Sequence, residues 1–168
     1  LLLCAEHQFV DGDVQHWWHP PLDRGVRTRC SDDYLWLPLA TCRYVEATGD
    51  RDVLNERVTY IEGRQVDPDE ESYYDLPSRS GLRETLYQHC VRALQRALDR
   101  FGERGLPLIG TGDWNDGMNR VGEGGRGESV WLGWFLYDVL NRFNVLARDR
   151  GDLLFAERCV ERAARLRE

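Results

Sequence analysis

Two adjacent carboxylates, Asp32 and Asp33, lie between a pair of arginines and an aromatic, apolar run in the stretch Gly25–Pro38. Just upstream, the segment Gln15–Pro21 contains two neighbouring tryptophans. Tryptophan is large and has a polar tip, so a pair of them indicates more than loop filler. Together the two segments predict the floor of a site for a polar ligand.

A second polar loop follows an apolar lead within Leu106–Asn119 and contains Asp113 and Asp116. These aspartates could be turn residues that bond to their own loop, or they could contact a substrate. The glycine-rich segment Gly122–Gly127 lacks the Gly-Lys-Ser/Thr run of a nucleotide P-loop. We interpret it as a hinge or lid and assign no phosphate site to it.

The two histidines His16 and His19 raise the question of a zinc site. They are followed at once by two prolines, which prevents them from sharing a regular helix face, and no third ligand is obvious. We therefore expect no metal and interpret these side chains as lining a cleft.

The charge and composition of the chain limit the kinds of partner that it can bind. The 168 residues hold 29 acidic and 22 basic side chains, for a formal charge of -7, and every basic residue is an arginine. An acidic surface argues against nucleic-acid binding. A local arginine site for phosphate or carboxylate remains possible because the guanidinium fork suits both anions.

The apolar runs, the cysteines and the chain ends give expectations about the location of the protein and the extent of its domain. No apolar run approaches the ~20 residues that span a bilayer, so we expect no membrane contact from this segment. Five widely spaced cysteines without a Cys-x-x-Cys motif favour reduced thiols and a cytoplasmic location, although the parent protein could be membrane-anchored. The chain starts without methionine and stops inside a helical pattern, which predicts a fragment of a longer protein.

Helical patterns must position these residues. Ser31 can cap a helix, with Asp32 and Asp33 in its first turn. Pro38 then predicts either a kink or a helix that begins near it, and both versions place Asp32 at a helix entrance. The helix ends at Gly49.

Further helices are predicted after Asp50 through Val58, over residues 82–101, from Glu128 to Leu146 and from Asp152 onward, because apolar residues recur three and four apart. Residues 61–79 are predicted to form a long acidic loop. Helical hairpins separated by polar loops predict an all-α chain.

Four blocks in order resemble one known family: Gly12–Pro20, Arg27–Pro38, Gly112–Asn119 and Gly127–Leu132. They are similar to the catalytic domain of glycoside hydrolase family ninety-four, which contains cellobiose and chitobiose phosphorylases, 1,2-β-oligoglucan phosphorylases and the C-terminal part of cyclic β-1,2-glucan synthases. The residues in these blocks are most similar to those of the glucan synthase branch, and the resemblance covers nearly the whole chain.

The resemblance implies an (α/α)6 barrel of which residues 1–168 form one partial catalytic domain, completed by the remainder of the same barrel. It implies inverting phosphorolysis of a β-glucan or disaccharide to α-glucose 1-phosphate, or the reverse synthesis, with inorganic phosphate as co-substrate and no cofactor. The family's general acid is mapped to Asp32, with Asp33 as the fallback. The main phosphate ligands are expected beyond residue 168.

The resemblance also suggests which residues contact substrate. Tryptophans can stack on sugar faces, while arginine, glutamine and aspartate can hydrogen-bond hydroxyl groups. The candidate substrate-binding residues are Gln15, Trp17, Trp18, Arg27, Arg29, Asp33, Trp36, Asp113, Trp114 and Asp116.

A phosphorylase needs one carboxylic acid for the leaving oxygen, because phosphate itself is the nucleophile. Burial and the charge of Asp33 would raise the pKa of Asp32, whereas Arg27 and Arg29 would lower it. Two alternatives are an inverting hydrolase with Asp113 or Asp116 as the base and a non-catalytic helical glucan-binding module.

Several residues also have purely structural interpretations. Asp32 and Asp33 could simply stabilise a helix start. Trp131 and Trp134 are expected in the core, as is Cys90, and His89 is expected to be a hydrogen-bonded core or interface histidine.

Overall fold

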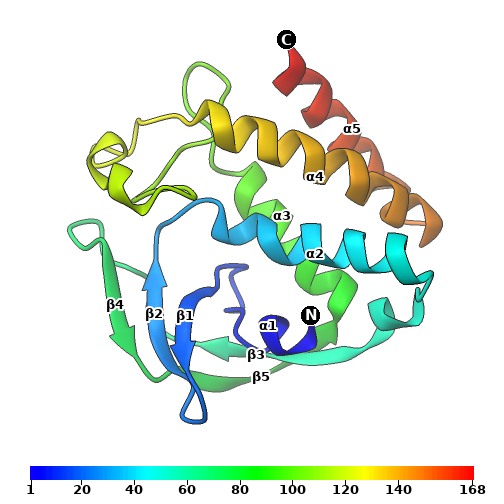
Figure 1. Ribbon diagram of the computed structural model, residues 1–168, viewed down its shortest axis with the longest axis horizontal. Helices are drawn as coiled ribbons and strands as arrows, with labels where there is room; N and C mark the ends of the chain where they lie inside the picture. Colours follow the sequence, from blue (N-terminus) through cyan, green and yellow to red (C-terminus); the bar gives the residue numbers. More distant parts are fainter.

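The computed structural model describes the whole chain, Leu1–Glu168. The four long helices lie together on one side of the molecule, and two small antiparallel sheets lie on the other (Figure 1). In chain order the elements are α1 (Leu2–Ala5), β1 (Gln15–His19), β2 (Arg24–Thr28), α2 (Asp33–Thr48), η1 (Asp52–Asn55), β3 (Arg57–Glu62), β4 (Ser72–Asp75), β5 (Ser78–Thr85), α3 (Leu86–Leu98), η2 (Asp116–Val121), α4 (Val130–Asp149) and α5 (Leu153–Arg167), where η marks a 3-10 helix.

The expectation of an all-α chain, and with it of part of an (α/α)6 barrel built of helical hairpins, is wrong. The structure is mixed, because β1, β2 and β4 form one antiparallel sheet and β3 and β5 form a second. The strands are short and rich in polar residues, and two of the three pairings, β2 with β4 and β3 with β5, join segments that are separated along the chain. Such strands lack the apolar alternation by which a half-buried strand is detected from sequence.

The helices pack around one core of 26 buried apolar residues. Helix α2 contacts α3 and α4, and α4 packs along α5. Each of the last three helices has a side-chain N-cap, in which Thr85, Ser129 and Asp152 accept a hydrogen bond from the backbone of the first turn. The sequence patterns that predicted α4 and α5 are therefore confirmed, and His89 and Cys90 lie in the core as predicted.

Helix α2 begins before Pro38 and continues through it to the left-handed Gly49, so the interpretation in which the helix starts at Pro38 is wrong. Other boundaries also differ from expectation. The helix expected after Asp50 is a single 3-10 turn followed by β3. The acidic segment 61–79 contains β4 and the start of β5, and α3 begins only at Leu86.

The three-stranded sheet has two different faces because side chains alternate along each strand. Gln15 pairs with Arg27, which pairs with Tyr73, and this row faces the second sheet. The neighbouring row, Trp17, Val26 and Tyr74, faces the other way. We call these the inner face and the outer face of the sheet.

No helix has both the length and the apolar composition needed to cross a membrane. All five cysteines are free thiols.

Candidate functional site

Asp32 lies at the entrance of α2, where β2 passes into the helix, as the sequence predicted. Its carboxylate does not cap the helix. One oxygen, Oδ2, accepts a hydrogen bond of 2.9 Å from Trp36 Nε1, one helical turn further on. The other oxygen, Oδ1, is buried without a hydrogen-bond partner. The capping explanation for this carboxylate therefore does not fit its geometry.

Burial raises the pKa of the Asp32 carboxyl to about 6. The Trp36 hydrogen bond lowers this pKa, while the charges of Asp33 and Asp113 raise it. The expected influence of Arg27 is absent among the main causes, because its guanidinium is paired on the inner face of the sheet. A carboxyl with such a pKa is partly protonated near neutrality.

Asp33 is held by a hydrogen-bond network from the sheet. Thr28 Oγ1 donates to Asp33 Oδ2 at 3.0 Å, and His16 Nδ1 lies 3.0 Å from Asp33 Oδ1. The hydrogen bond to Asp33 raises the pKa of His16. The same Thr28 hydroxyl accepts from the backbone N–H of Cys30. The second carboxylate of the pair is thus tied to β1 and β2.

The loop of residues 108–116 docks onto the segment between β2 and α2. Ser31 Oγ donates to the carbonyl of Leu108 at 2.6 Å, and Cys30 and Gly110 form a β-bridge. A side chain at Gly110, which has a φ of 65°, would meet the carbonyl of Arg29 at 1.9 Å. Glycine is required there because the two backbones touch. This contact brings the second polar loop beside the carboxylate pair.

Three loop residues predicted as site residues have different environments. Asp113 is buried, and its two oxygens accept from Ser129 Oγ at 2.7 Å and from the backbone N–H of Asn115 at 3.1 Å. Trp114 is 61% exposed. The exposed carboxylate of Asp116 has Oδ2 3.8 Å from His16 Nε2, across from Asp33. The loop therefore brings one open carboxylate beside Asp32 and Asp33, and we call the side of the molecule formed by these three aspartates the acidic face.

A row of aromatic rings leads from Asp32 to this loop. Its ring centroids are 4.7 Å apart from Trp36 to Phe135, 5.3 Å from Phe135 to Trp131, and 6.0 Å from Trp131 to Trp114. Trp131 is 37% exposed and Trp134 is 72% exposed, so the expectation that both lie in the core is wrong. Their stretch of α4 faces outward from the helix layer.

Three residues predicted to bind substrate lie on the inner face or beneath the sheet. Arg27 is 1% exposed, and it bonds to Asp13 at 2.9 Å and to Asp11 at 2.6 Å. Gln15 is buried and accepts a hydrogen bond from His7, whose ring stacks on Trp18 at 3.8 Å. These buried contacts stabilise the fold.

Arg29 and Trp17 complete the predicted set. Arg29 is half-buried between β2 and α2, with its Nε buried and unpartnered. Trp17 is 43% exposed on the outer face of the sheet. The structure thus brings Asp32, Asp33, Trp36, Trp114 and Asp116 to one side and separates the inner-face residues from them.

Sequence reasoning missed several residues of this region. The sequence indicates His16 only as a side chain that lines a cleft, with no partner predicted for it, and it does not single out Thr28, Tyr74 or Phe135. Strand register places Thr28 and Tyr74, and helix packing places Phe135. Only His16 carried a signal in the sequence, because it adjoins the tryptophan pair.

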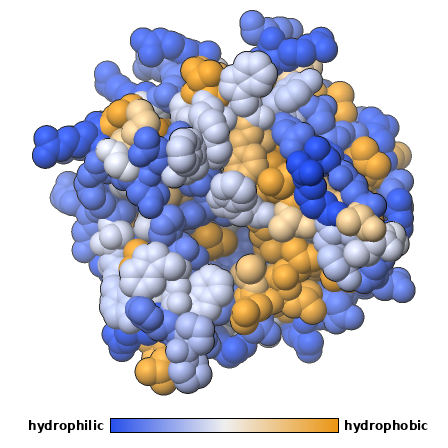
Figure 2. Space-filling view, in the orientation of Figure 1, coloured by the Kyte–Doolittle hydropathy of each residue, from blue (hydrophilic) through white to orange (hydrophobic).

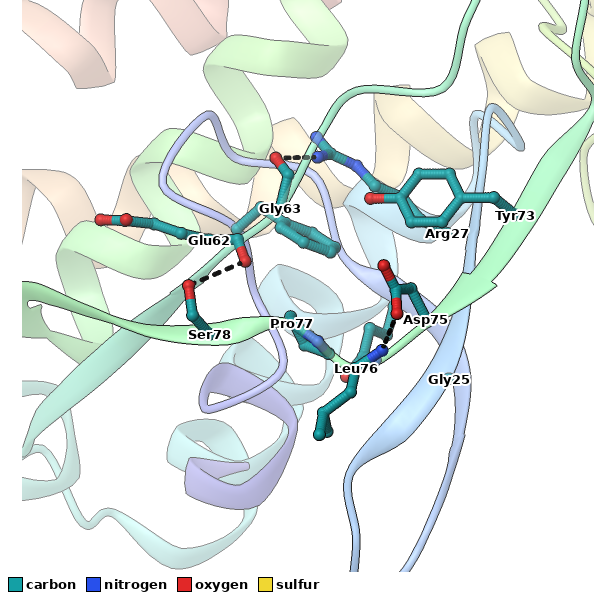
Figure 3. Close-up of a pocket in the computed structure, with 11 residues that line it drawn as sticks. Gly25, Arg27, Glu62, Gly63, Tyr73, Asp75, Leu76, Pro77 and Ser78 are labelled. Carbon is teal, nitrogen blue, oxygen red and sulfur yellow. Dashed lines mark hydrogen bonds between the residues drawn. The ribbon is translucent and has the colours of Figure 1, made fainter.

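A cavity of about 180 Å³ lies between the two sheets, on the inner face of the three-stranded sheet (Figure 3). Arg27 points into it beside Tyr73, and its Nη1 donates to the backbone carbonyl of Gly63. Asp75 caps the adjoining turn by accepting from the backbone N–H of Leu76 at 2.7 Å. The polar groups seen here are bonded to one another, which fits a structural cavity.

His16, Cys30 and Asp33 place one nitrogen, one sulfur and one oxygen within 4.8 Å of one another. Burial raises the pKa of the Cys30 thiol to about 11. A metal would have to displace that proton and the hydrogen bond between His16 and Asp33. The trio is better explained as part of the network around Asp33.

The whole chain, residues 1–168, matches the sequence profile described as the glycosyl hydrolase 94 superfamily, catalytic domain. The chain belongs to this family, which confirms the resemblance found in the sequence.

Among curated relatives, the chain is 50% identical over 152 residues to the cyclic beta-(1,2)-glucan synthase NdvB of Rhizobium meliloti (strain 1021), covering 90% of this chain and 5% of that protein. It is 33% identical over 164 residues to a solabiose phosphorylase of Paenibacillus borealis, covering 97% of this chain and 18% of the relative. It is 28% identical over 144 residues to an N,N'-diacetylchitobiose phosphorylase of Vibrio furnissii, covering 86% of this chain and 15% of the relative. The chain therefore spans less than a fifth of the length of these relatives.

Proposed function

We propose that this domain takes part in the inverting phosphorolysis of β-linked glucosides to α-glucose 1-phosphate, or in the reverse synthesis. Membership of the family and the phosphorylase names among its relatives support this reaction class. Inorganic phosphate is the co-substrate, and its main ligands come from outside residues 1–168. A β-1,2-linked glucan is the first substrate to test, since the similar NdvB is named for that linkage.

The observation that carries the proposal is the acidic face itself, where one carboxyl can reach a substrate. A general acid must touch the glycosidic oxygen. Asp116 is exposed, follows the exposed Trp114 and lies beside His16. Asp32 is only 5% exposed, and its two oxygens are bonded to Trp36 or buried. We therefore assign the proton transfer to Asp116.

Phosphorolysis requires only one carboxyl group from the protein, which acts as the proton donor. The Asp116 carboxyl gives its proton to the glycosidic oxygen as the bond from that oxygen to C1 breaks. A phosphate oxygen bonds to C1 from the opposite side, which inverts the configuration. A sugar stacked on Trp114 would displace water from Asp116.

The sequence-based assignment of the acid to Asp32 stays a prediction, which its raised pKa supports. In the hydrolase alternative a second carboxylate activates water. Asp113 is unsuited to that role because Ser129 and the Asn115 N–H occupy its oxygens. Asp116 remains available as a base.

The deciding experiment measures release of α-glucose 1-phosphate from β-1,2-linked glucooligosaccharides by the full-length protein, with and without phosphate. We expect Asp116→Asn to lower kcat about 10²- to 10⁴-fold. We expect Asp32→Asn to have less than about a tenfold effect. The matched control is Asp69→Asn, an exposed aspartate in the segment between β3 and β4.

Each other outcome has a defined meaning. A large loss in Asp32→Asn with activity retained in Asp116→Asn would assign the acid to Asp32. Turnover that does not need phosphate would favour the hydrolase. Glucan binding without turnover in any condition would favour the binding module.

A further inference from the structure

Aromatic side chains gather on the outer face of the three-stranded sheet, away from the carboxylates. Trp17 and Tyr74 come from opposite edge strands and lie across Val26 of the central strand, with ring centroids 5.6 Å apart. Trp17 is 43% exposed and Tyr74 47% exposed. Figure 2 shows pale side chains of intermediate hydropathy over this end of the molecule, where Figure 1 places β1, β2 and β4.

Polar groups border the two rings. The His19 ring packs edge-on against both, at 5.1 Å from Trp17 and 6.0 Å from Tyr74. The Arg24 guanidinium lies 5.7 Å from the Tyr74 centroid and within 3.8 Å of Asp75. Flat aromatic faces surrounded by hydrogen-bonding groups suit a sugar ring, which has apolar C–H faces and a polar edge. Protein interfaces also combine aromatic residues with a polar rim, and we favour a sugar here because the chain belongs to the glycosyl hydrolase 94 superfamily.

The same face of the sheet continues to the acidic face. Thr28 is two residues beyond Val26 on β2, so its side chain points to the same side, and its hydroxyl bonds to Asp33. Two strand residues span about 7 Å. A saccharide whose scissile bond lies at the acidic face would therefore meet the rings only through sugar units further along the chain.

We propose that Trp17 and Tyr74, with His19 and Arg24 at their edge, form a distal subsite that binds a β-glucan chain beyond the bond being cleaved. This inference rests on the proposed function and adds that the substrate is an oligosaccharide rather than a disaccharide. We call these four residues the distal platform.

The test compares β-1,2-linked glucooligosaccharides of two and six units in the full-length protein. For the Trp17→Ala/Tyr74→Ala variant we expect the ratio of kcat/KM for the hexasaccharide to that for the disaccharide to fall about tenfold, the equivalent of two stacking contacts near 0.7 kcal/mol each. Trp17→Phe/Tyr74→Phe keeps both rings and should retain most of the ratio. Trp134→Ala, which removes a 72% exposed tryptophan from α4, should not change it.

Binding is measured separately by calorimetry with the hexasaccharide on the Asp116→Asn background and without phosphate. A tenfold weaker Kd in the alanine variant supports the distal platform even if phosphorolysis is absent, so the two proposals fail independently. An unchanged selectivity ratio together with an unchanged Kd would overturn the distal platform.

Discussion

The two faces of the three-stranded sheet hold the same kinds of residue and use them differently. On the inner face, Arg27 lies between two aspartates, its guanidinium 3.9 Å from the Phe9 ring centroid, and is shielded from water. On the outer face, Arg24 lies over Tyr74 in solvent. An arginine with aromatic and acidic neighbours is therefore not evidence of a ligand site until its exposure is known. The comparison predicts that the inner face governs stability and the outer face governs activity.

The largest expected effect is on the inner face. Arg27→Met leaves the buried Asp13 and the neighbouring Asp11 without their counter-charge, and loss of one member of a buried ion pair costs about 3–5 kcal/mol. Chemical denaturation of the parent and variant measures this difference. The matched control Arg24→Met removes an exposed arginine and should change stability by less than about 0.5 kcal/mol. Equal effects of the two substitutions would contradict the division between faces.

A smaller effect is expected at Asp32. Its pKa is raised in the folded protein, so the folded state holds the proton more tightly than the unfolded state, and stability falls as pH rises from about 4 to about 6. Asn cannot ionise and should be more stable than Asp at pH 7 by about 1–2 kcal/mol after solvent screening is allowed for. At pH 3.5 the two should be alike. Thermal melts across this range test the prediction, and a variant less stable at pH 7 would contradict it.

The smallest effect is expected at His16. Its pKa is raised chiefly by the hydrogen bond to Asp33, so this contribution is complete below the ordinary histidine pKa and is lost as pH rises through the higher folded value. Because His16 is half-buried, we expect the contribution to be below about 1 kcal/mol. His16→Asn should flatten the stability profile between pH 6 and 8. NMR titration of the imidazole gives the pKa directly, and an unshifted value would remove the basis of this prediction.

The sequence predicted the long helices α2, α4 and α5, but it extended α3 into β5, placed a helix where η1 and β3 lie, and missed both sheets. The patterns for α4 and α5 are regular and have caps, so local information sufficed. Strand β2 pairs with β4 through Arg27 and Tyr73, which lie far apart in the chain, and β4 is a short polar run. No local periodicity reveals such a pairing. Its partners are specified by packing between distant segments.

The same limit applied to the site. The position of Asp32 at a helix entrance followed from capping and proline rules, because those rules concern neighbouring residues. Whether Arg27 or Gln15 faces ligand or core depends on which way one strand is turned, and a shift of one residue reverses the answer. Family resemblance located the region, whereas strand register determined which of its side chains are accessible.

The polar loop that docks through Gly110 onto the segment between β2 and α2 also closes on itself, because Gly110 touches the backbone of Gly122. A side chain at Gly122 would meet the carbonyl of Gly110 at 1.8 Å. The two ends of the loop that carries Trp114 and Asp116 are therefore in direct backbone contact. Compact loops with adjoining ends are often exchangeable units. The segment between these glycines could be transplanted between relatives as one cassette, with the helical layer left intact. Substrate preference could therefore diverge within the family by replacement of this loop alone.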